Sequence, residues 1–189
     1  MFKDGDETDP CSYRSILLLS IFNGIFEKIM SKRLKVFLNK HDIFYQSQFG
    51  FRERRSTEHE ILDIVSKIQA IMVMSMFLCG IFIDLQKAFD TVDHSILLLK
   101  LNHYGIRGVV NDWFSSYLSG RVQTTQIGPY ISQKEKTLCR VPQGSVLGPL
   151  LFPIYINEIY SASEKLVFHM FADDTNLLFA EKALNLLKW

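Results

Sequence analysis

The chain has few cysteines and no long apolar run, and both absences exclude classes of protein. Its cysteines, Cys11, Cys79 and Cys139, are an odd set without CxxC spacing, so the sequence predicts neither a zinc site nor a disulfide framework. Glycine, proline or charged residues break the apolar runs before the roughly 18 residues that a membrane-spanning helix needs. Residues 1–10 are acidic and polar, unlike a secretory signal peptide. We therefore expect an intracellular protein that has no membrane partner.

The chain also lacks an excess of charge of one sign. Its 189 residues include 21 Lys and Arg against 20 Asp and Glu, a net charge of +1, which is low for a nucleic-acid binder. Phosphate binding would therefore need local basic clusters. Two such clusters are present: Lys28, Lys32, Arg33, Lys35 and Lys40, then Arg52, Arg54 and Arg55. The first is explained equally well by the solvent-facing side of an amphipathic helix.

Two adjacent carboxylates separate two short apolar runs near the end of the chain. Residues 168–179 read FHMFADDTNLLF, with Asp173 and Asp174 in the middle. Runs this short, rich in aromatic and branched residues, predict a β-hairpin with its acids at the turn. Taken alone, the pattern is better explained by a polar turn than by a chemical site, because Asp and Asn tolerate the backbone angles of turns.

A second apolar run, at residues 77–83, also ends in an acid, Asp84. If both runs are buried neighbouring strands, Asp84 and Asp173 meet at one edge of a sheet. Carboxylates gathered there would repel one another unless cations neutralise them. Oxygen-only ligands suit Mg²⁺, and a pair of such ions can assist an in-line phosphoryl displacement. The two runs together indicate a metal-dependent phosphoryl-transfer site.

Three motifs, taken in order, resemble a known family. They are FIDLQKAFD at residues 82–90, VPQGSVLGP at residues 141–149 and FADD at residues 171–174. In order and spacing they resemble those of a reverse transcriptase, and more narrowly the enzyme of Jockey-like non-LTR retrotransposons. The resemblance covers residues 2–184. One of these motifs alone would be a weak signal, but the three together are highly specific.

This resemblance implies an α+β fold, the fingers and palm of a polymerase, with a mostly antiparallel sheet backed by helices. Residues 1–75 would be mainly fingers, and residues 76–189 mainly palm, truncated at the C-terminus. In the family, the palm continues into a primer grip and a helical thumb, and an endonuclease usually precedes it. We therefore expect a fragment of a larger polyprotein.

The resemblance also implies a reaction and its metal site. The reaction is metal-dependent nucleotidyl transfer onto a primer 3′-hydroxyl, with an RNA template, a DNA primer and dNTPs as partners. Asp84, Asp173 and Asp174 would hold two Mg²⁺ ions, for which Mn²⁺ could substitute. Their carboxylates would be the catalytic groups of the chain.

By the same resemblance, the nucleotide would be bound by Arg14, Phe89, Gln143 and Gly144. Arg14 lies in YRSILLLS, similar to the family's YRPISLLS, and its guanidinium fork suits a triphosphate. Phe89 would exclude a ribose 2′-hydroxyl, although without the family it is as readily a core aromatic. Gln143 and Gly144 would seat the base pair, since glycine permits close approach.

The template strand would contact Phe51, Arg52 and Arg55, which lie in GFRERRST at residues 50–57. An aromatic ring beside arginines offers both base stacking and phosphate contact. Without the family, the same residues would be a charged loop.

Periodicity predicts helices and one further hairpin around these motifs. The helices cover residues 20–38, 56–74, 93–104 and 109–118, and a fifth follows the turn at residues 141–144 and runs to about residue 159. The hairpin pairs residues 121–127 with residues 132–140. Thr57 and Glu60 fit a capping box at the start of the second helix. The predicted buried stripe of that helix is Ile61, Ile64, Val65, Ile68 and Met72.

Two departures from the family support a second hypothesis. Arg140 stands where the family usually has Gly, and Pro153 stands inside a helix, where proline costs about 3 kcal/mol. The chain could thus be a catalytically inactive, truncated remnant that retains the fold and at most weak nucleic-acid binding. A third hypothesis is an aspartate-pair hydrolase such as a glycosidase or acid protease. It gives no role to Gln143 or to the arginines.

Overall fold

Helices make up most of the regular structure. The computed structural model describes residue 6 and residues 21–182, except residues 86, 125, 128, 137–138 and 142–143. Within this part the α-helices are α1 (Ile21–Lys40), α2 (Thr57–Val73), α3 (His94–His103), α4 (Val109–Leu118) and α5 (Gly148–Ile156). Two short 3₁₀ helices are η2 (Ala88–Asp90) and η3 (Asn157–Ala162). The five predicted helical regions are confirmed, with shifts of a few residues at some ends.

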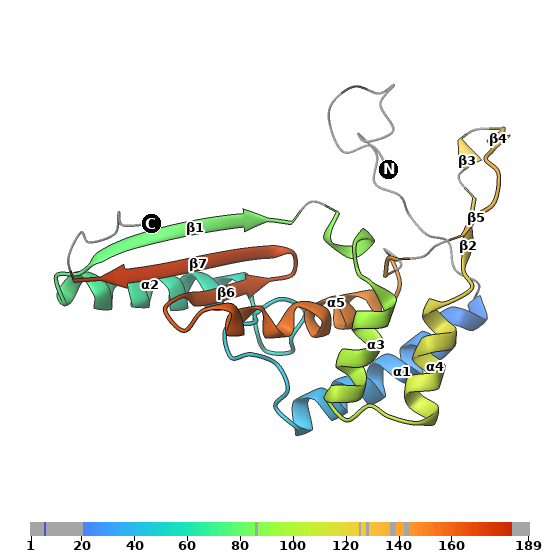
Figure 1. Cartoon of the computed structure of the whole chain (residues 1–189), viewed down its shortest axis with the longest axis horizontal. Helices are drawn as coiled ribbons and strands as arrows, with labels where there is room; N and C mark the ends of the chain where they lie inside the picture. The colour runs from blue at the N-terminus through green and yellow to red at the C-terminus, as the bar shows by residue number, and fades with distance from the viewer. Residues whose placement is uncertain are drawn as a thin grey trace.

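A three-stranded antiparallel sheet lies at the end of the molecule opposite α1, α3 and α4 (Figure 1). Its strands are β1 (Phe77–Asp84), β6 (Val167–Phe171) and β7 (Asp174–Glu181). Their order is β1-β7-β6, so β7 is central and pairs with both neighbours. The predicted strand that begins at residue 77 and the predicted hairpin around Asp173 are both confirmed. The expected burial of the first strand is wrong, because Phe77, Ile81 and Phe82 of β1 are 47%, 48% and 76% exposed. Together with the helices, the sheet gives the predicted α+β fold.

A second, much smaller β-ribbon projects from the helical end (Figure 1). It consists of β2 (Val122–Gln123) paired with β5 (Glu135–Lys136), and β3 (Gln126–Ile127) paired with β4 (Tyr130–Ile131). The predicted hairpin is therefore confirmed, although its inner ladder pairs residues 126–127 with residues 130–131 and not with residues 132–140. The ladders are two residues long each, as expected for an alternation that was weak in the sequence.

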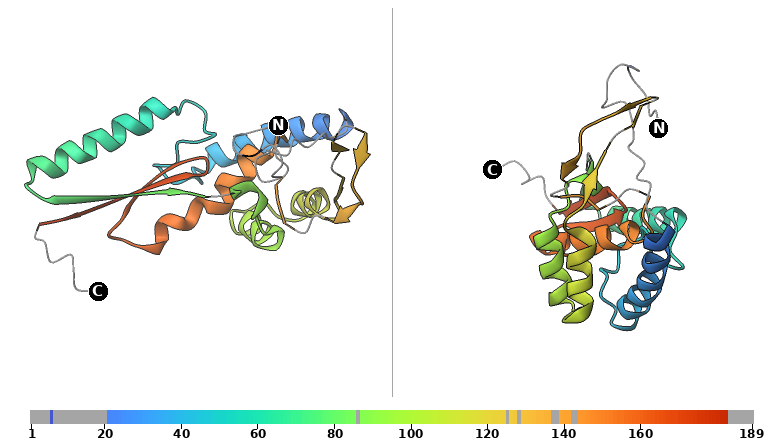
Figure 2. Two further views of the ribbon diagram at one scale, coloured as in Figure 1. Left: turned by 90° about the horizontal axis from the view of Figure 1, so that it is seen from above. Right: turned by 90° about the vertical axis from the view of Figure 1, so that its right-hand side faces the viewer.

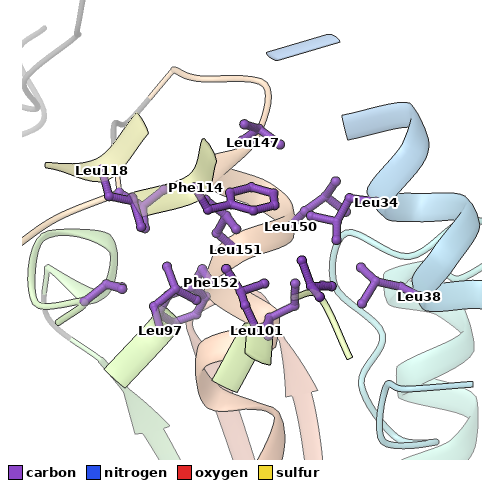
Figure 3. Packing of buried hydrophobic residues seen from close by; sticks show 14 of the residues in the cluster. Leu34, Leu38, Leu97, Leu101, Phe114, Leu118, Leu147, Leu150, Leu151 and Phe152 are labelled. Carbon is purple, nitrogen blue, oxygen red and sulfur yellow. The ribbon is translucent and has the colours of Figure 1, made fainter. Parts of the chain in front are cut away.

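The main hydrophobic core lies among the helices, beside the sheet end (Figure 3). It is built from leucines and phenylalanines that are at most 5% exposed: Leu34, Leu38, Leu97, Leu101, Phe114, Leu118, Leu147, Leu150, Leu151 and Phe152. Asp93 caps α3, since its side chain accepts hydrogen bonds from the N–H groups of Ser95 and Ile96. Such packing fixes the helices that support the strand ends.

The predicted buried stripe of α2 is largely wrong. Ile61, Val65 and Met72 are 59%, 42% and 69% exposed. The face turned to the sheet instead starts at Glu60, which is only 6% exposed, and continues through half-buried residues: Asp63, Ile64, Lys67, Ile68 and Ile71. The helix cap also differs by one residue, because Ser56, not Thr57, accepts the hydrogen bond from the His59 N–H. Polar partners on the sheet explain this rotation of the helix.

The sheet lies between α2 on one side and α5 on the other when the molecule is seen from above (Figure 2). α5 contains Pro153 in its interior, and the α-helical geometry ends at Ile156, where η3 begins. Leu150, Leu151, Phe152 and Ile154 are all buried, so packing holds this helix although Pro153 cannot donate a backbone hydrogen bond. None of the described helices is long and apolar enough to cross a bilayer.

Candidate active site

Two neighbouring strands bring acids from separate motifs together. In the antiparallel ladder of β1 and β7, Phe82 stands opposite Asn176 and Asp84 stands opposite Asp174. Residues directly opposite each other in such a ladder project from the same face, with Cβ atoms about 4.5–5.5 Å apart. Both carboxylates are exposed at the end of the sheet. The two acidic runs thus meet at one edge of the sheet as predicted, but the residue opposite Asp84 is Asp174 and not Asp173, which was expected there.

Asp173 lies in the tight turn between β6 and β7. Phe171 pairs with Asp174, which leaves Ala172 and Asp173 as a two-residue loop. Ala172 has φ +56° and Asp173 has no positive φ. A positive φ at the first loop position alone is typical of a type II′ turn, whose twist suits a hairpin. The half-buried Asp173 is therefore the last residue of the turn, directly before Asp174 in the chain.

A pocket of about 390 Å³ opens beside these carboxylates. Its sheet side includes Asp84 and Asp174, and its helix side includes Thr57 and Glu60 of α2. The Glu60 carboxylate accepts a hydrogen bond from the side-chain amide of Asn176, with 3.1 Å between Oε1 and Nδ2. The start of α2 is thereby fixed to the strand that carries Asp174.

The acids at this edge influence one another. Burial raises the pKa of the Glu60 carboxyl above its ordinary value of 4.5. The hydrogen bond from Asn176 opposes this shift, and the negative charge of Asp174 adds to it. An additional positive charge in the pocket would stabilise the ionised form of Glu60.

The carboxylates fit a hard divalent cation that also binds substrate. Their oxygens are the ligands that Mg²⁺ prefers, and they are exposed beside an open pocket. In the described part of the chain, no three His, Cys, Asp or Glu residues are gathered closely enough to hold an ion by themselves. Mg²⁺ commonly takes one or two carboxylates and completes its shell with water and substrate phosphates. The residues present therefore suit a metal site that substrate completes.

The predicted template residues lie in a loop, the template loop, next to the turn of Ala172 and Asp173. Phe51 is 42% exposed, and its ring meets the edge of the Phe89 ring at a centroid distance of 6.3 Å. The Arg55 guanidinium lies 5.2 Å from the centre of the Phe49 ring. Arg52 is turned inward, and its Nη1 donates to the backbone carbonyls of Tyr45 and Gln48. Burial, followed by the charge of Arg55, lowers the pKa of Arg52.

Phe89 is half-buried in η2, between the template loop and the core. Its ring packs on Phe152 at a centroid distance of 4.7 Å as well as touching Phe51. Backbone hydrogen bonds tie the following loop to it, because the Val141 N–H donates to the Phe89 carbonyl. The neighbouring Asp90 forms an ion pair with Arg140, with 2.7 Å between Oδ1 and Nε. Asp90 is thus engaged by an arginine of the distant loop.

The remaining predicted nucleotide residues are only partly within the described chain. Arg14 and Gln143 lie outside the described residues. Gly144 has φ +91°, a conformation that favours glycine. The loop that follows it is held by Glu27 of α1, which is 1% exposed and accepts hydrogen bonds from the Val146 N–H and from the Tyr117 hydroxyl. Glu27 thereby fixes the backbone just after the predicted base-pair seat.

A cluster of the buried His169 with the half-buried Asp63 and Lys67 joins α2 to β6 on the same side of the sheet as Glu60. His169 is fully buried, and its Nε2 lies 3.0 Å from Asp63 Oδ2 and 3.0 Å from Lys67 Nζ. Lys67 is also 2.8 Å from the same carboxylate oxygen. Nδ1 of His169 has no hydrogen-bond partner among the described residues. Burial, reinforced by Lys67, lowers the pKa of His169.

Sequence reasoning missed Glu60, Asn176 and Glu27 as residues of this region. Glu60 was assigned to a helix cap, and its burial against a strand more than a hundred residues away leaves no local signal. Asn176 lies two positions after Asp174 in β7, so the alternation of side chains along a strand, which puts both residues on one face, was the signal available. Glu27 left no signal in the apolar pattern of α1, because Ile21, Ile25 and Ile29 are exposed. The buried face of this helix runs through Glu27 and Ser31 instead.

Comparison with known proteins places the chain in a family. The family described as reverse transcriptase (RNA-dependent DNA polymerase) matches residues 3–187. The chain is 30% identical over 186 residues to the probable RNA-directed DNA polymerase from transposon X-element of Drosophila melanogaster. It is 29% identical over 187 residues to the RNA-directed DNA polymerase from mobile element jockey of the same organism. These alignments cover 93% and 94% of this chain but 20% of each relative.

A solved structure supports the fold independently. Apo telomerase from Candida Tropicalis, truncated from its C-terminal domain, superposes with a TM-score of 0.53 at 12% identity. The match covers 87% of this chain and 35% of the telomerase chain. At this identity the likeness concerns the fold alone, which agrees with polymerase fingers and palm. Because the family matches nearly the whole chain and the relatives are retrotransposon polymerases, the chain belongs to the reverse transcriptase family, in its non-LTR retrotransposon branch.

Proposed function

We propose that this chain is the fingers-and-palm part of an RNA-directed DNA polymerase that acts inside the cell. Residues 1–75 would form mainly fingers and residues 76–189 mainly palm. The observation that carries the proposal is the register of β1 and β7, in which Asp84 stands opposite Asp174, the residue that follows Asp173 in the turn. The chain spans about a fifth of the length of its relatives, so further parts of a larger protein would complete the grip on the primer and template.

Asp84, Asp173 and Asp174 would hold the metal through their carboxylate oxygens. When bound, two Mg²⁺ ions would stabilise the attacking 3′-oxygen of the primer and the leaving oxygen of the triphosphate. The ladder of β1 and β7 and the tight turn at Ala172 position the backbone that carries these three carboxylates. A carboxylate set held in place before substrate arrives needs little reorganisation during the reaction.

The residues around the carboxylates would bind the polymerase substrates. Phe51 and Arg55 are suited to stack on template bases and to contact template phosphates, while Arg52 stabilises their loop from within. Phe89 is held by Phe51 and Phe152, so its ring is rigid enough to exclude a ribose 2′-hydroxyl. Arg14 would bind the triphosphate, and Gln143 with Gly144 would seat the base pair.

Single-nucleotide extension tests the proposed function. Purified chain would be given a DNA primer on an RNA template, one complementary dNTP and Mg²⁺. We expect extension that Asp173→Asn reduces on the order of 100-fold or more, because several kcal/mol of charge stabilisation depend on the metal. The matched control is Asp112→Asn, which removes an exposed carboxylate in α4 and should leave the rate unchanged. Extension that persists in Asp173→Asn would contradict the assignment.

A second candidate function, that of an inactive remnant, is favoured by two observations. Arg140 has φ +109°, a conformation that suits glycine, and Pro153 interrupts the hydrogen bonds of α5. The same assay separates the candidates if the parent chain is silent. Extension by the double variant Arg140→Gly and Pro153→Leu would assign the loss to these substitutions. Continued silence would favour a remnant that keeps the fold and at most weak nucleic-acid binding.

A further inference from the structure

Residues 47–49, just before the template loop, lie beside β6 and are joined to it by a single β-bridge. Gln48 forms a parallel bridge with Met170. The Phe49 N–H donates to the Met170 carbonyl at 2.7 Å, and the Met170 N–H donates to the Ser47 carbonyl at 2.9 Å. Gln48 and Phe49 are 0% and 2% exposed. This segment is thus fixed to the strand that leads into the turn of Ala172 and Asp173, which is called the catalytic turn because it carries the proposed metal ligand Asp173.

The next residue, Gly50, touches the backbone of the catalytic turn. A Cβ atom placed on Gly50 would lie 2.1 Å from the Ala172 nitrogen and 3.0 Å from both the Ala172 Cα and the Phe171 carbonyl carbon. Gly50 is not among the glycines with positive φ, so its backbone conformation does not require glycine. Space alone requires it. Ala172 is the first residue of the two-residue loop, and Asp173 is the second.

No side-chain movement can relieve such a contact, because every atom that the Cβ would meet belongs to the backbone. The segment at Gly50 and the turn at Ala172 would have to separate by about 1 Å before the contact became tolerable. Ladder hydrogen bonds restrain the chain on the near side of Gly50, and Ala172 at φ +56° restrains the turn. A separation would therefore move the turn that carries Asp173 relative to Asp84, which β1 holds separately.

We propose that Gly50 is a positioning residue that seats the turn of Ala172 and Asp173 at the height needed to share a site with Asp84. This inference rests on the proposed polymerase function, since it assigns Gly50 a role in the same site. Gly50 touches neither substrate nor metal and acts through the turn backbone. Its absence of a side chain lets the template loop, which begins at Phe51, lie directly against the catalytic turn.

Gly50→Ala tests the inference, with Gly80→Ala as the matched control. Gly80 lies in β1, and a Cβ there would meet only side-chain atoms of Phe82 and Leu178, at 3.6 Å or more. Three quantities would be measured in the full chain: amide hydrogen exchange at Phe49 and Met170, the dissociation constant for Mn²⁺, and the rate of single-nucleotide extension. Hydrogen exchange measures how often the hydrogen bonds between residues 47–49 and Met170 open. The affinity for Mn²⁺ reports the geometry of the carboxylates without requiring catalysis.

We expect Gly50→Ala to speed exchange at Phe49 and Met170 at least about tenfold, because the ladder bonds must open. We also expect Mn²⁺ affinity to fall and extension to slow by about 100-fold, the usual effect of a misplacement of about 1 Å. Gly80→Ala should stay near the parent in all three measurements. Unchanged exchange in Gly50→Ala would contradict the close packing of Gly50 on the turn. Faster exchange with unchanged Mn²⁺ affinity and extension would contradict the positioning role of Gly50.

A second variant keeps the test decisive if Gly50→Ala fails to fold. Glycine at position 172 accepts more backbone conformations, so Ala172→Gly lets the turn yield to the new Cβ. Adding Ala172→Gly to Gly50→Ala should therefore restore cooperative urea unfolding while extension and Mn²⁺ affinity stay low. Equal effects of Gly50→Ala in both backgrounds would overturn the contact. If the parent chain neither extends a primer nor binds Mn²⁺, the polymerase proposal fails, and hydrogen exchange alone still decides whether Gly50 seats the turn.

Discussion

At the scale of single residues, Arg140 shows how a site can carry backbone strain. Its φ is +109°, a region in which a residue with a Cβ costs of order 1–3 kcal/mol. Several contacts hold it there: its N–H donates to the Val92 carbonyl, its carbonyl is 2.8 Å from His94 Nε2, and its guanidinium pairs with Asp90. The glycine that the family usually has at this position is explained by this backbone angle.

Arg140→Gly should stabilise the protein when its ion pair with Asp90 has first been removed by a second substitution. In an Asp90→Asn background, we expect Arg140→Gly to raise the free energy of unfolding by about 1 kcal/mol, because strain is released and no partner charge is left unpaired. In the parent background, the gain should be smaller, since a partly exposed pair contributes up to about 1 kcal/mol. Urea unfolding midpoints measure both differences. A lower stability in the Asp90→Asn background would show that the positive φ carries no strain.

Single residues also mark the limit of sequence reasoning about the site. Asp84, Asp173 and Asp174 could be found because each stands where a short apolar run ends. Glu60 could not, because its contact with Asn176 joins residues that are 116 positions apart. Gly50 was visible only as part of a motif. Its close approach to Ala172 is a matter of three-dimensional packing, which no local pattern records.

At the scale of elements, α2 departs furthest from its sequence pattern. Its apolar residues suggested one buried stripe, but the face on the sheet carries Glu60, Asp63 and Lys67. The reason is that β6 and β7 present His169 and Asn176 to the helix, and buried polar groups need partners. Hydrophobic periodicity located the helix correctly and failed to orient it, since it contains no information on the partners.

The contact between α2 and β6 should depend on pH through His169. Its folded pKa is lowered, first by burial and then by Lys67, so below about 6.5 the unfolded chain binds the proton more readily than the folded chain. Stability should therefore fall as the pH drops from 7 to 5, with a slope of at most about 1.4 kcal/mol per pH unit. Denaturant unfolding of the parent and of His169→Gln, which keeps an N–H donor for Asp63, would measure this.

The difference between the two curves isolates His169 from other groups that titrate nearby. Glu60 has a raised pKa and acts in the opposite direction, because its stabilising effect is lost as the pH rises above 4.5. Asp63 has a lowered pKa and loses its contribution only below 3.8. Parallel curves for the parent and His169→Gln between pH 5 and 7 would show that His169 does not take part in the pH dependence.

At the scale of the whole molecule, the fold follows from patterns that act over short distances. Short apolar runs located β1, β6 and β7, and helical periodicity located α3 and α4. The arrangement of these elements was available only through the family resemblance, because the pairing of β1 with β7 joins runs about 90 residues apart. That pairing is what turns two acidic strand ends into one site.

The central claim is that Asp84 and Asp174 belong to one metal site. A double-mutant cycle that measures Mn²⁺ binding tests this claim most directly. The parent chain, Asp84→Asn, Asp174→Asn and the double variant would be titrated and followed by electron paramagnetic resonance. If the two carboxylates share one site, each single variant should weaken binding strongly, and the double variant should lose little more, since residues that act as a unit are not additive. Independent, additive losses in the two variants, or a parent chain that binds no Mn²⁺, would contradict the account.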